Sequence, residues 1–254
     1  MVAETERRIY AASAEPGRAN RRGIDMADAL EYLVEDGIAV IRLDDGKANA
    51  LGPPMLDALH AALDRALDEE VQAIVLLGRA GRFSAGFDLG VMGQGPEAVR
   101  AMVGRGAELA LRFFECPVPI LIGATGHTLA MGAVLLLAVD ERIGAKGEFK
   151  IGLNEVAIKM TMPEFAILLA RERLSKRHLQ RAISQAEIYS PEGAVDAGYL
   201  DEAVPIEEVE ARTMARARGL VQSLHPRAHR ETKHALRHDA IQRLRQEVDA
   251  MLHG

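Results

Sequence analysis

Two apolar segments of this chain are each followed by small residues and then by a helix-like run. Residues 73–77 (AIVLL) precede SAGFDL, and residues 119–124 (PILIGA) precede GHTLAMGAVLLLA. Neither segment alternates with polar residues, so both are typical of strands that are buried on two faces. Strands of this kind alternating with helices indicate an α/β fold built from βαβ units.

The rest of the chain extends this alternation. A hairpin is predicted over residues 30–45, where two β-rich runs flank Asp36-Gly37. Apolar residues at helical spacing predict four further helices, over residues 54–69, 97–116, 162–174 and 175–185. Residues 190–198 read as a helix that Ser190 caps and Gly198 ends, and the chain from about Ile206 is helical.

The length of 254 residues allows one large domain, or one domain with a small appendage. Hydrophobic residues make up 48% and charged residues 27%, which is the balance of an ordinary globular protein. Residues 1–28 are polar and lack the apolar stretch of a secretory signal. We predict a flexible N-terminal extension over residues 1–28, a core over residues 29–200 and a C-terminal helical region over residues 201–254.

The net charge of -6 argues against a nucleic-acid-binding surface. The late arginines between Arg171 and Arg245 fit exposed helix faces better than a phosphate-binding patch. The single cysteine, Cys116, excludes an intrachain disulfide and lies among apolar residues, as a buried side chain in a reducing compartment would. No apolar run approaches the roughly 20 residues of a membrane span, and no histidines and acids have metal-ligand spacing. We therefore expect a cytoplasmic protein without a metal.

The two small-residue turns carry the first functional hypothesis. Each lies between a strand and a helix, where backbone N–H groups point outward and the helix dipole favours negative charge. If the two strands are neighbours in the sheet, two N–H groups can bind one oxygen and form an oxyanion hole, in which one donor contributes about 2.7–4 kcal/mol. Judged on pattern alone, ordinary tight turns remain the alternative.

Five segments resemble, in order and spacing, the crotonase family, also called the enoyl-CoA hydratase/isomerase superfamily. They are KANAL (47–51), FSAGFDL (83–89), GHTLAMGAVLLLAVD (126–140), IGLNEVAI (151–158) and AVDAGYLDEAV (194–204). The resemblance implies a ββα spiral over the core and a coenzyme A thioester as substrate. It also implies a homotrimer or a dimer of trimers, with residues 201–254 as the oligomerisation region. The apolar face of the late helices could be buried on a neighbouring subunit; its residues are Leu220, Val221, Leu224, Leu236, Ile241, Leu244 and Val248.

The resemblance also implies a site. The thioester oxygen is expected between two backbone N–H groups at positions that match Phe87 and Met131, with Gly132 taking the second role if the register shifts by one. More loosely, the surrounding loops are expected to bind the substrate through Lys47, Ala48, Ala50, Ser84, Ala85, Asp88, Leu89 and Gly132. Gly90 stands where the family often has a basic residue for a CoA phosphate, so Lys47 and Lys233 are our candidates for that contact. No separate cofactor is expected, because coenzyme A arrives as part of the substrate.

Hydratases of this family use two glutamates. The first position falls on Val134, inside an apolar run, and the second matches Glu155, although the interval from Phe149 is about two residues longer than usual. A single carboxylate can move a proton between two carbons but is less suited to adding water. We therefore expect Glu155 to act as the proton shuttle of an enoyl-CoA isomerisation, with a pKa that burial raises.

Several alternatives stay open at this point. Hydration by Glu155 alone is one, and a non-catalytic acyl-CoA-binding protein is another. Serine hydrolysis through Ser84 is disfavoured, because RFSAG lacks the glycine two positions before the serine and nothing marks triad partners. Glu155 could also be an ordinary surface glutamate. We expect Asp88 to cap a helix, Asp140 to make a structural contact and His127 to pack or hydrogen-bond.

Overall fold

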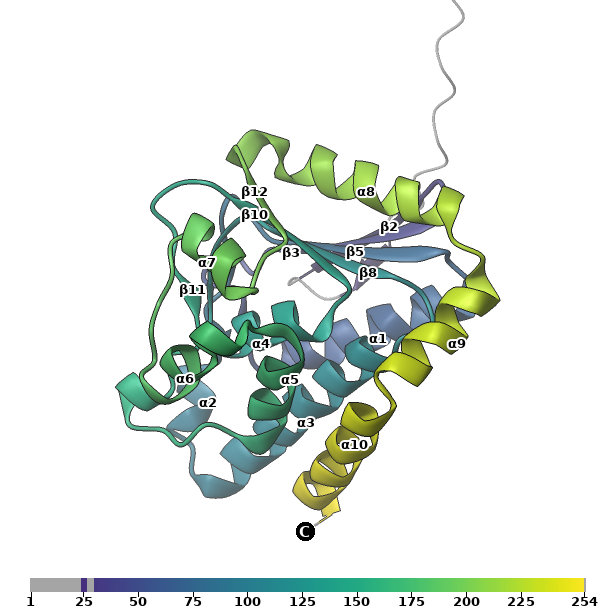
Figure 1. Cartoon of the computed structure of the whole chain (residues 1–254). Coiled ribbons are helices and arrows are strands. Elements are labelled where there is room, and N and C mark those ends of the chain that lie inside the picture. Colours follow the sequence, from purple (N-terminus) through teal and green to yellow (C-terminus); the bar gives the residue numbers. More distant parts are fainter. Residues whose placement is uncertain (1–23, 27–29, 254) are drawn as a thin grey trace, which may run out of the picture.

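The computed structural model describes residues 24–26 and 30–253 and contains a seven-stranded sheet with helices on both faces (Figure 1). The strand order is β1-β2-β3-β5-β8-β10-β12. Strands β3, β5, β8, β10 and β12 run parallel, and β1 and β2 add an antiparallel end. The strands are β1 (Ile24–Met26), β2 (Leu30–Glu35), β3 (Ile38–Leu43), β5 (Ala73–Leu77), β8 (Ile120–Ala124), β10 (Glu141–Ala145) and β12 (Glu202–Val204).

The hairpin between β2 and β3 turns over two residues. Glu35 pairs with Ile38, and the two residues between them, Asp36 and Gly37, have φ angles of 52° and 74°. Positive φ at both positions is the requirement of the turn that matches the twist of two adjacent strands. The predicted hairpin is therefore confirmed at its predicted turn.

A short strand outside the main sheet follows each of the parallel strands β3, β5, β8 and β10, before the next helix. The order is β4 (Ala50–Leu51) and α1 (Pro53–Asp68), then β6 (Gly81–Ser84), β7 (Gly86–Phe87), α2 (Leu89–Met92) and α3 (Pro96–Glu115), then β9 (Gly126–Leu129) and α4 (Met131–Ala138). With β11 (Ile151–Gly152), the strands β6 and β9 form a second sheet, and β4 pairs with β7. The expected ββα spiral is confirmed.

Helices on both faces explain why the central strands do not alternate with polar residues. In β5, Ile74 and Leu76 belong to the main core, together with residues of α1, α3 and α4. The intervening Val75 packs on the other face with Met214 and Ala217 of α8 (Val209–Ser223). Figure 1 shows α8 above the sheet and α1, α3 and α4 below it.

Three helices follow β11 after the short 3₁₀ helix η1 (Val156–Ile158), namely α5 (Glu164–Arg173), α6 (Lys176–Ser184) and α7 (Pro191–Ala197). The Ser190 hydroxyl accepts a hydrogen bond from Gly193 N at 3.2 Å, so the predicted cap of α7 is confirmed. Gly198 ends that helix with a φ of 100°, a left-handed conformation that glycine adopts without a steric penalty.

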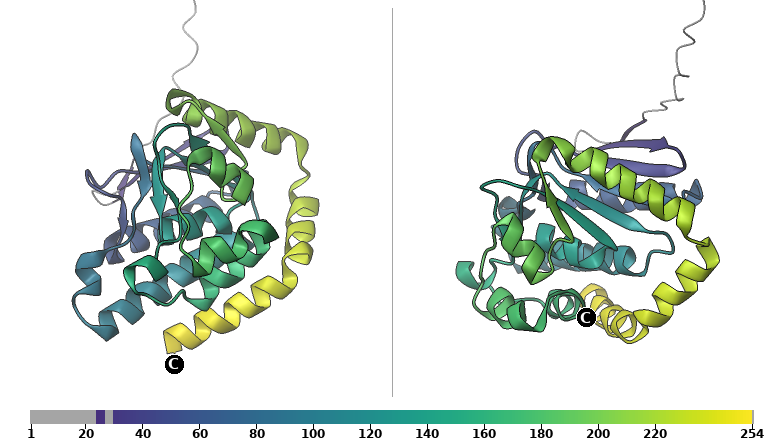
Figure 2. Two further views of the ribbon diagram at one scale, coloured as in Figure 1. Left: turned by 60° about the vertical axis from the view of Figure 1, so that its left-hand side comes forward. Right: turned by 45° about the horizontal axis from the view of Figure 1, so that its top comes forward.

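The last helices fold back over the core of the same chain. After η2 (Ile206–Glu208) and α8, α9 (Pro226–Leu236) and α10 (His238–His253) run down one side of the molecule (Figure 2). Ile241, Leu244 and Val248 are buried in the main core, because α10 packs against α3 and α5. The expectation that these three residues pack on a neighbouring subunit is therefore wrong.

Two predicted boundaries need comment. Most of the extension predicted over residues 1–28 lies outside the described residues, but Ile24–Met26 form β1 and pair with β2. The C-terminal region predicted as helical from residue 201 begins instead with strand β12, because Glu202–Val204 complete the sheet beside β10. No helix in the described ranges has the length and apolarity to cross a membrane.

A largely buried ion cluster ties the C-terminal helices to the sheet. Asp140, which follows α4, accepts hydrogen bonds from Lys233 Nζ at 2.6 Å, Arg237 Nη2 at 2.8 Å and Ile120 N at 2.9 Å. Burial alone would raise the pKa of Asp140, but the two cations and these hydrogen bonds lower it. The expected structural role of Asp140 is confirmed. Our choice of Lys233 as a phosphate contact is wrong, because this lysine is buried and engaged by Asp140.

Candidate active site

The predicted site residues gather at one edge of the main sheet. The loops that follow the carboxyl ends of β3, β5, β8 and β10 span residues 44–49, 78–80, 125 and 146–150, and each leads into the short strands beside the sheet. Ligands of open parallel sheets bind at this edge, because neighbouring loops diverge there and leave backbone groups free.

The first small-residue turn is held by a buried serine. Ser84 Oγ donates to Asn49 O at 2.7 Å and accepts from Gly86 N at 3.1 Å, and Ala85 N donates to Ala48 O at 3.0 Å. Gly86 has a φ of 92°, which a residue with a side chain adopts only with strain. These bonds join the KANAL loop to the turn that presents Phe87.

The second turn contains a strained residue. Ala130 has a φ of 50° and a ψ of -127°, a combination that is rare outside glycine, and its N–H donates to Gly152 O at 3.0 Å. Helix α4 begins at Met131, so the N–H groups of Met131 and Gly132 lie in its first turn, where no preceding helical carbonyl can accept them.

The glycines let the two turns touch. A Cβ atom on Gly86 would lie 2.5 Å from Ala130 Cβ and 3.1 Å from Met131 N, and a Cβ on Gly132 would lie 2.8 Å from Ser84 Cβ. Only a bare backbone permits such an approach. The structure therefore brings the Gly86 turn and the start of α4 side by side, as the oxyanion hypothesis requires.

The side chains of Phe87 and Met131 turn towards α3. A Cβ atom on Gly106 would lie 2.6 Å from Phe87 Cε1 and 3.4 Å from Met131 Cε. Phe87 is half-buried and Met131 is fully buried. Their side chains thus pack against α3, and what the two turns offer for chemistry is their backbone.

Glu155 is buried and has no charged partner within residues 24–26 and 30–253. Its side chain belongs to the segment after β11, whose Gly152 pairs with Leu129 of β9 and accepts the Ala130 N–H. The residue is 7% exposed, so the alternative of a surface glutamate is wrong. Among the described residues, Glu155 Oε2 is the one carboxylate oxygen that is buried without a hydrogen-bond partner. Burial raises the pKa of Glu155, and a backbone hydrogen bond lowers it by less.

Helix α4 contributes no second acid to the site of Glu155. All residues of this helix are buried and apolar or glycine, and Val134, at the position of the first hydratase glutamate, is 1% exposed. The site therefore contains a pair of adjoining backbone turns and a single desolvated carboxyl group.

The family model of enoyl-CoA hydratase/isomerase matches residues 34–253. This chain belongs to the enoyl-CoA hydratase/isomerase family. The match covers most of the chain, including every predicted site residue, and it establishes the protein as an enzyme of that family.

Named relatives carry both activities of the family. Enoyl-CoA delta isomerase 1 of Mus musculus, a mitochondrial protein, is 28% identical over 222 residues, which cover 83% of this chain and 76% of that protein. A probable enoyl-CoA hydratase of Rhodobacter capsulatus is 33% identical over 193 residues, which cover 74% of this chain and 73% of that protein. A solved structure of an enoyl-CoA hydratase/isomerase family protein from Pseudomonas syringae is 39% identical with a TM-score of 0.86, covering 90% of this chain and 99% of that chain.

The other predicted residues of the hydratase/isomerase site lie around the same turns. Asp88 caps α2 by accepting from Gly90 N at 2.8 Å, which confirms the expected cap. Lys47, Ala85 and Leu89 are exposed, with Leu89 at 72%, whereas Ala48 and Ala50 are half-buried. The exposed residues are therefore accessible from outside the protein.

Sequence reasoning missed Asn49 of the KANAL loop. This fully buried side chain donates to Leu43 O at 2.9 Å and to Phe83 O at 3.0 Å, and its backbone has a φ of 47°. It thereby fastens the end of β3 to β6. Asparagine tolerates the left-handed region and bonds to nearby backbone, so its type in a loop was a usable signal. The strain at Ala130 has no such signal, because alanine does not mark turns.

The serine-hydrolase alternative is wrong for this family member. The Ser84 hydroxyl is committed to Asn49 O, and no histidine bonds to it. His127 instead accepts from Lys150 N at 3.0 Å through Nδ1 and packs edge-on against Phe149 at 5.4 Å, which confirms its expected packing role. Nucleophile and base are therefore not paired here.

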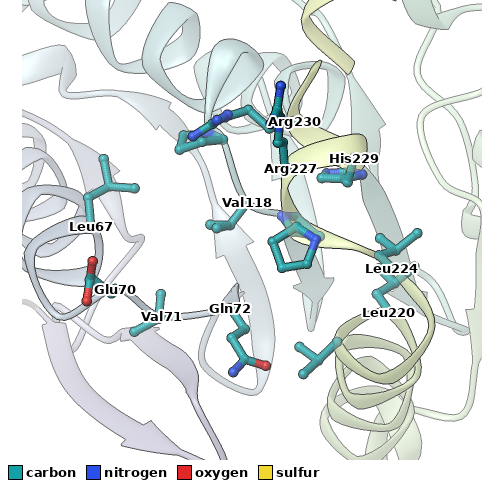
Figure 3. Close-up of a pocket in the computed structure, with 14 residues that line it drawn as sticks. Leu67, Glu70, Val71, Gln72, Val118, Leu220, Leu224, Arg227, His229 and Arg230 are labelled. Atoms are coloured by element: carbon teal, nitrogen blue, oxygen red, sulfur yellow. The ribbon is translucent and has the colours of Figure 1, made fainter. Parts of the chain in front are cut away.

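A cavity of about 500 Å³ lies elsewhere, beside α8 and α9 (Figure 3). It is lined by segments that precede β5 and β8, with Gln72 and Val118, and by Leu224 and Arg230 from the C-terminal helices. These segments lie at the amino ends of the strands, opposite the loops that carry Glu155, so none of the predicted site residues lines it.

Proposed function

We propose that this enzyme isomerises enoyl-CoA thioesters by moving a double bond along the acyl chain. The observation that carries the proposal is the lone, buried and unpartnered carboxyl of Glu155 beside the acid-free helix α4. Isomerisation needs one group that takes a proton from one carbon and returns it to another, whereas hydration must also position and split a water molecule.

In the proposed reaction, the Glu155 carboxylate removes a proton from C2 of a 3-enoyl-CoA. The electron pair of the broken C–H bond shifts into the thioester, whose oxygen becomes an enolate between the N–H groups of Phe87 and Met131. Protonated Glu155 then delivers the same proton to C4, and the double bond forms between C2 and C3. Two preorganised donors aimed at the developing charge supply most of the stabilisation in sites of this kind.

The burial of Glu155 suits this role. Because burial raises its pKa, the carboxylate is a stronger base than an exposed glutamate, and its conjugate acid forms at lower cost. The absence of a counter-ion among the described residues leaves both protonation states accessible, as a proton shuttle requires.

The substrate-binding assignments belong to the same proposal. The coenzyme A part would lie along the loops with Lys47, Ala48, Ala50, Ala85, Asp88 and Leu89, together with Ser84 and Gly132 at the turns. Ser84 would contribute through its backbone, because its hydroxyl is engaged. Lys47 is exposed and remains our candidate for a phosphate contact. Coenzyme A as part of the substrate is the only cofactor-like group proposed.

Oligomeric state and location also stay predictions. A homotrimer or dimer of trimers is what the family resemblance implies, and sedimentation of the purified protein would measure it. The cytoplasmic location rests on the single cysteine, Cys116, and fractionation of the source cells would test it.

Matched 2-enoyl-CoA and 3-enoyl-CoA substrates, followed by mass spectrometry, test the reaction. We expect interconversion without a change of mass. A product heavier by one water would identify a hydratase, the second candidate, which the similarity to the Rhodobacter capsulatus protein favours. Binding of both thioesters without turnover would instead support the non-catalytic alternative.

A further inference from the structure

Two adjacent residues of the segment after β11, and Tyr199 after α7, have buried polar side-chain atoms without a partner among the residues that the structure describes. Within the described ranges, buried side-chain atoms without a hydrogen-bond partner include Glu155 Oε2, Asn154 Oδ1 and Tyr199 Oη. A buried polar atom without a partner costs free energy, so nearly all such atoms in proteins are paired. Unpaired groups that share one corner of the fold therefore indicate an interaction that is completed when the enzyme acts.

The fold places Tyr199 directly behind the segment that carries Glu155. Tyr199 follows α7, is fully buried, and its ring centroid lies 5.8 Å from that of Tyr189. The backbone of Tyr189 exchanges two hydrogen bonds with Ile151, at 2.9 and 3.0 Å, and Ile151 starts the strand that leads to Glu155. The two tyrosines thus support that strand from its inner side.

The hydroxyls of the two tyrosines differ. Tyr189 Oη donates to Glu187 Oε2 at 3.1 Å and lies 3.3 Å from His178 Nδ1, so it is satisfied. Tyr199 Oη donates to no group in the described part of the chain, while the backbone of Leu153, two residues before Glu155, lies close enough to it to lower its pKa. Burial first, then the charges of Tyr189 and Glu155, raise the pKa of Tyr199, and the Leu153 backbone lowers it by less.

We propose that Tyr199 is a positioning residue for Glu155, whose ionised carboxylate accepts a hydrogen bond from the Tyr199 hydroxyl, directly or through one water molecule. The inference rests on the proposed function, in which Glu155 is the proton shuttle. A phenol in this setting stays protonated, so it donates without adding charge. Holding one carboxylate oxygen orients the other towards the acyl chain and keeps the base ionised at neutral pH.

Few other titratable groups act on this pair. For Glu155, burial and a backbone hydrogen bond are the causes of the pKa shift. Tyr189 lies beside Tyr199, and the charged groups near Tyr189 are Glu187 and Arg181. The Tyr189 hydroxyl bonds to Glu187, and the charges of Glu187 and Arg181 act on it. Substitution of Tyr189 therefore serves as a matched control for the loss of one buried phenolic oxygen.

The test compares Tyr199→Phe with Tyr189→Phe, each of which removes one phenolic oxygen. The Glu155 carboxyl is titrated by infrared difference against Glu155→Gln, without substrate, and isomerisation is followed as a function of pH. For Tyr199→Phe we expect the proton affinity of Glu155 to rise about tenfold and kcat to fall about tenfold, with KM within about twofold. Tyr189→Phe should leave both the titration and kcat unchanged.

An unchanged Glu155 titration in folded Tyr199→Phe overturns the proposal. If the wild-type enzyme does not isomerise enoyl-CoA, the proposed function fails, but the substrate-free titration still decides whether the two groups are coupled. Should Tyr199→Phe fail to fold, 3-fluorotyrosine at position 199 retains the ring and strengthens the donor. It should lower the pKa of Glu155, and the absence of a shift would refute the coupling.

Discussion

Two carboxyl groups that are largely shielded from solvent, at opposite edges of the main sheet, have opposite surroundings. Asp140 lies near the amino end of β8 and accepts bonds from Lys233, Arg237 and Ile120 N. Glu155 lies beyond the carboxyl end of β10, and its Oε2 has no partner among the described residues. Burial acts to raise both pKa values, yet the pKa of Asp140 is lowered by its cations, whereas that of Glu155 stays raised.

The difference in surroundings indicates that Asp140 serves stability and Glu155 serves proton transfer. A largely buried acid with two cations is locked in one charge state and holds α9 and α10 against the sheet, so it serves stability. A buried acid without a counter-ion can change its charge state at modest cost, which a proton shuttle must do. Burial alone would not have told the two apart.

The largest expected effect is a loss of turnover when Glu155 is replaced. Glu155→Gln keeps the shape of the side chain but cannot accept a proton, so kcat should fall by about 10²–10⁴-fold. Steady-state kinetics with a 3-enoyl-CoA would measure this, and calorimetry should find CoA-thioester binding retained. Full activity in the variant would show that another group is the base.

Substitution of Asp140, the acid paired with two cations, should lower the free energy of unfolding rather than turnover. Asp140→Asn removes one charge from the cluster and leaves Lys233 and Arg237 buried without their counter-ion. Unfolding by urea should show a loss of about 3–5 kcal/mol, the usual cost of breaking a buried ion pair. Glu155→Gln is the matched control and should lose no stability. A loss in Asp140→Asn below about 1 kcal/mol would mean that the cluster is hydrated.

Two glycine substitutions, one in the candidate site and one in α8, test the backbone of the oxyanion turns. Gly86→Ala forces a Cβ within 2.5 Å of Ala130 Cβ at a φ of 92°, which would displace the turn before Phe87. We expect kcat to fall about a hundredfold, the effect of losing one oxyanion donor. Gly219→Ala in α8, where nothing lies within 4 Å, should keep its activity and gain about 0.5–1 kcal/mol of stability. Equal kcat in the two variants would contradict the oxyanion assignment.

The smallest effects are in the pH dependence of stability. The pKa of Glu155 lies above its ordinary 4.5, so ionising it favours the unfolded chain, and its penalty grows as pH rises from 4.5 through the raised value. The pKa of Asp140 lies below 3.8, so its contribution is complete above 3.8 and is lost as pH falls through the lowered value. Melting temperatures of wild type, Glu155→Gln and Asp140→Asn across pH should diverge in these separate windows. A common window for both variants would disprove this distinction.

The sequence by itself determined the elements and their order. The hairpin at Asp36-Gly37, the cap at Ser190 and the stop at Gly198 depend on residues close in the chain, so local patterns predicted them. The family was indicated by the resemblance of five segments to the motifs of a known family, and Glu155 was singled out within one of them. Strands without alternation indicated that both faces of the sheet are covered, without showing which helix covers which face.

Only the tertiary structure decided which charges meet. Lys233 lies 93 residues from Asp140 in the sequence, and no local pattern shows that Asp140 engages it. The burial of Ile241 against the chain's own α3 and α5, the strain at Ala130 and the burial of the Tyr199 hydroxyl also depend on distant segments. Sequence patterns report periodicity and turn chemistry over a few residues, whereas ion pairing, desolvation and close backbone approach arise from contacts between segments far apart in the chain.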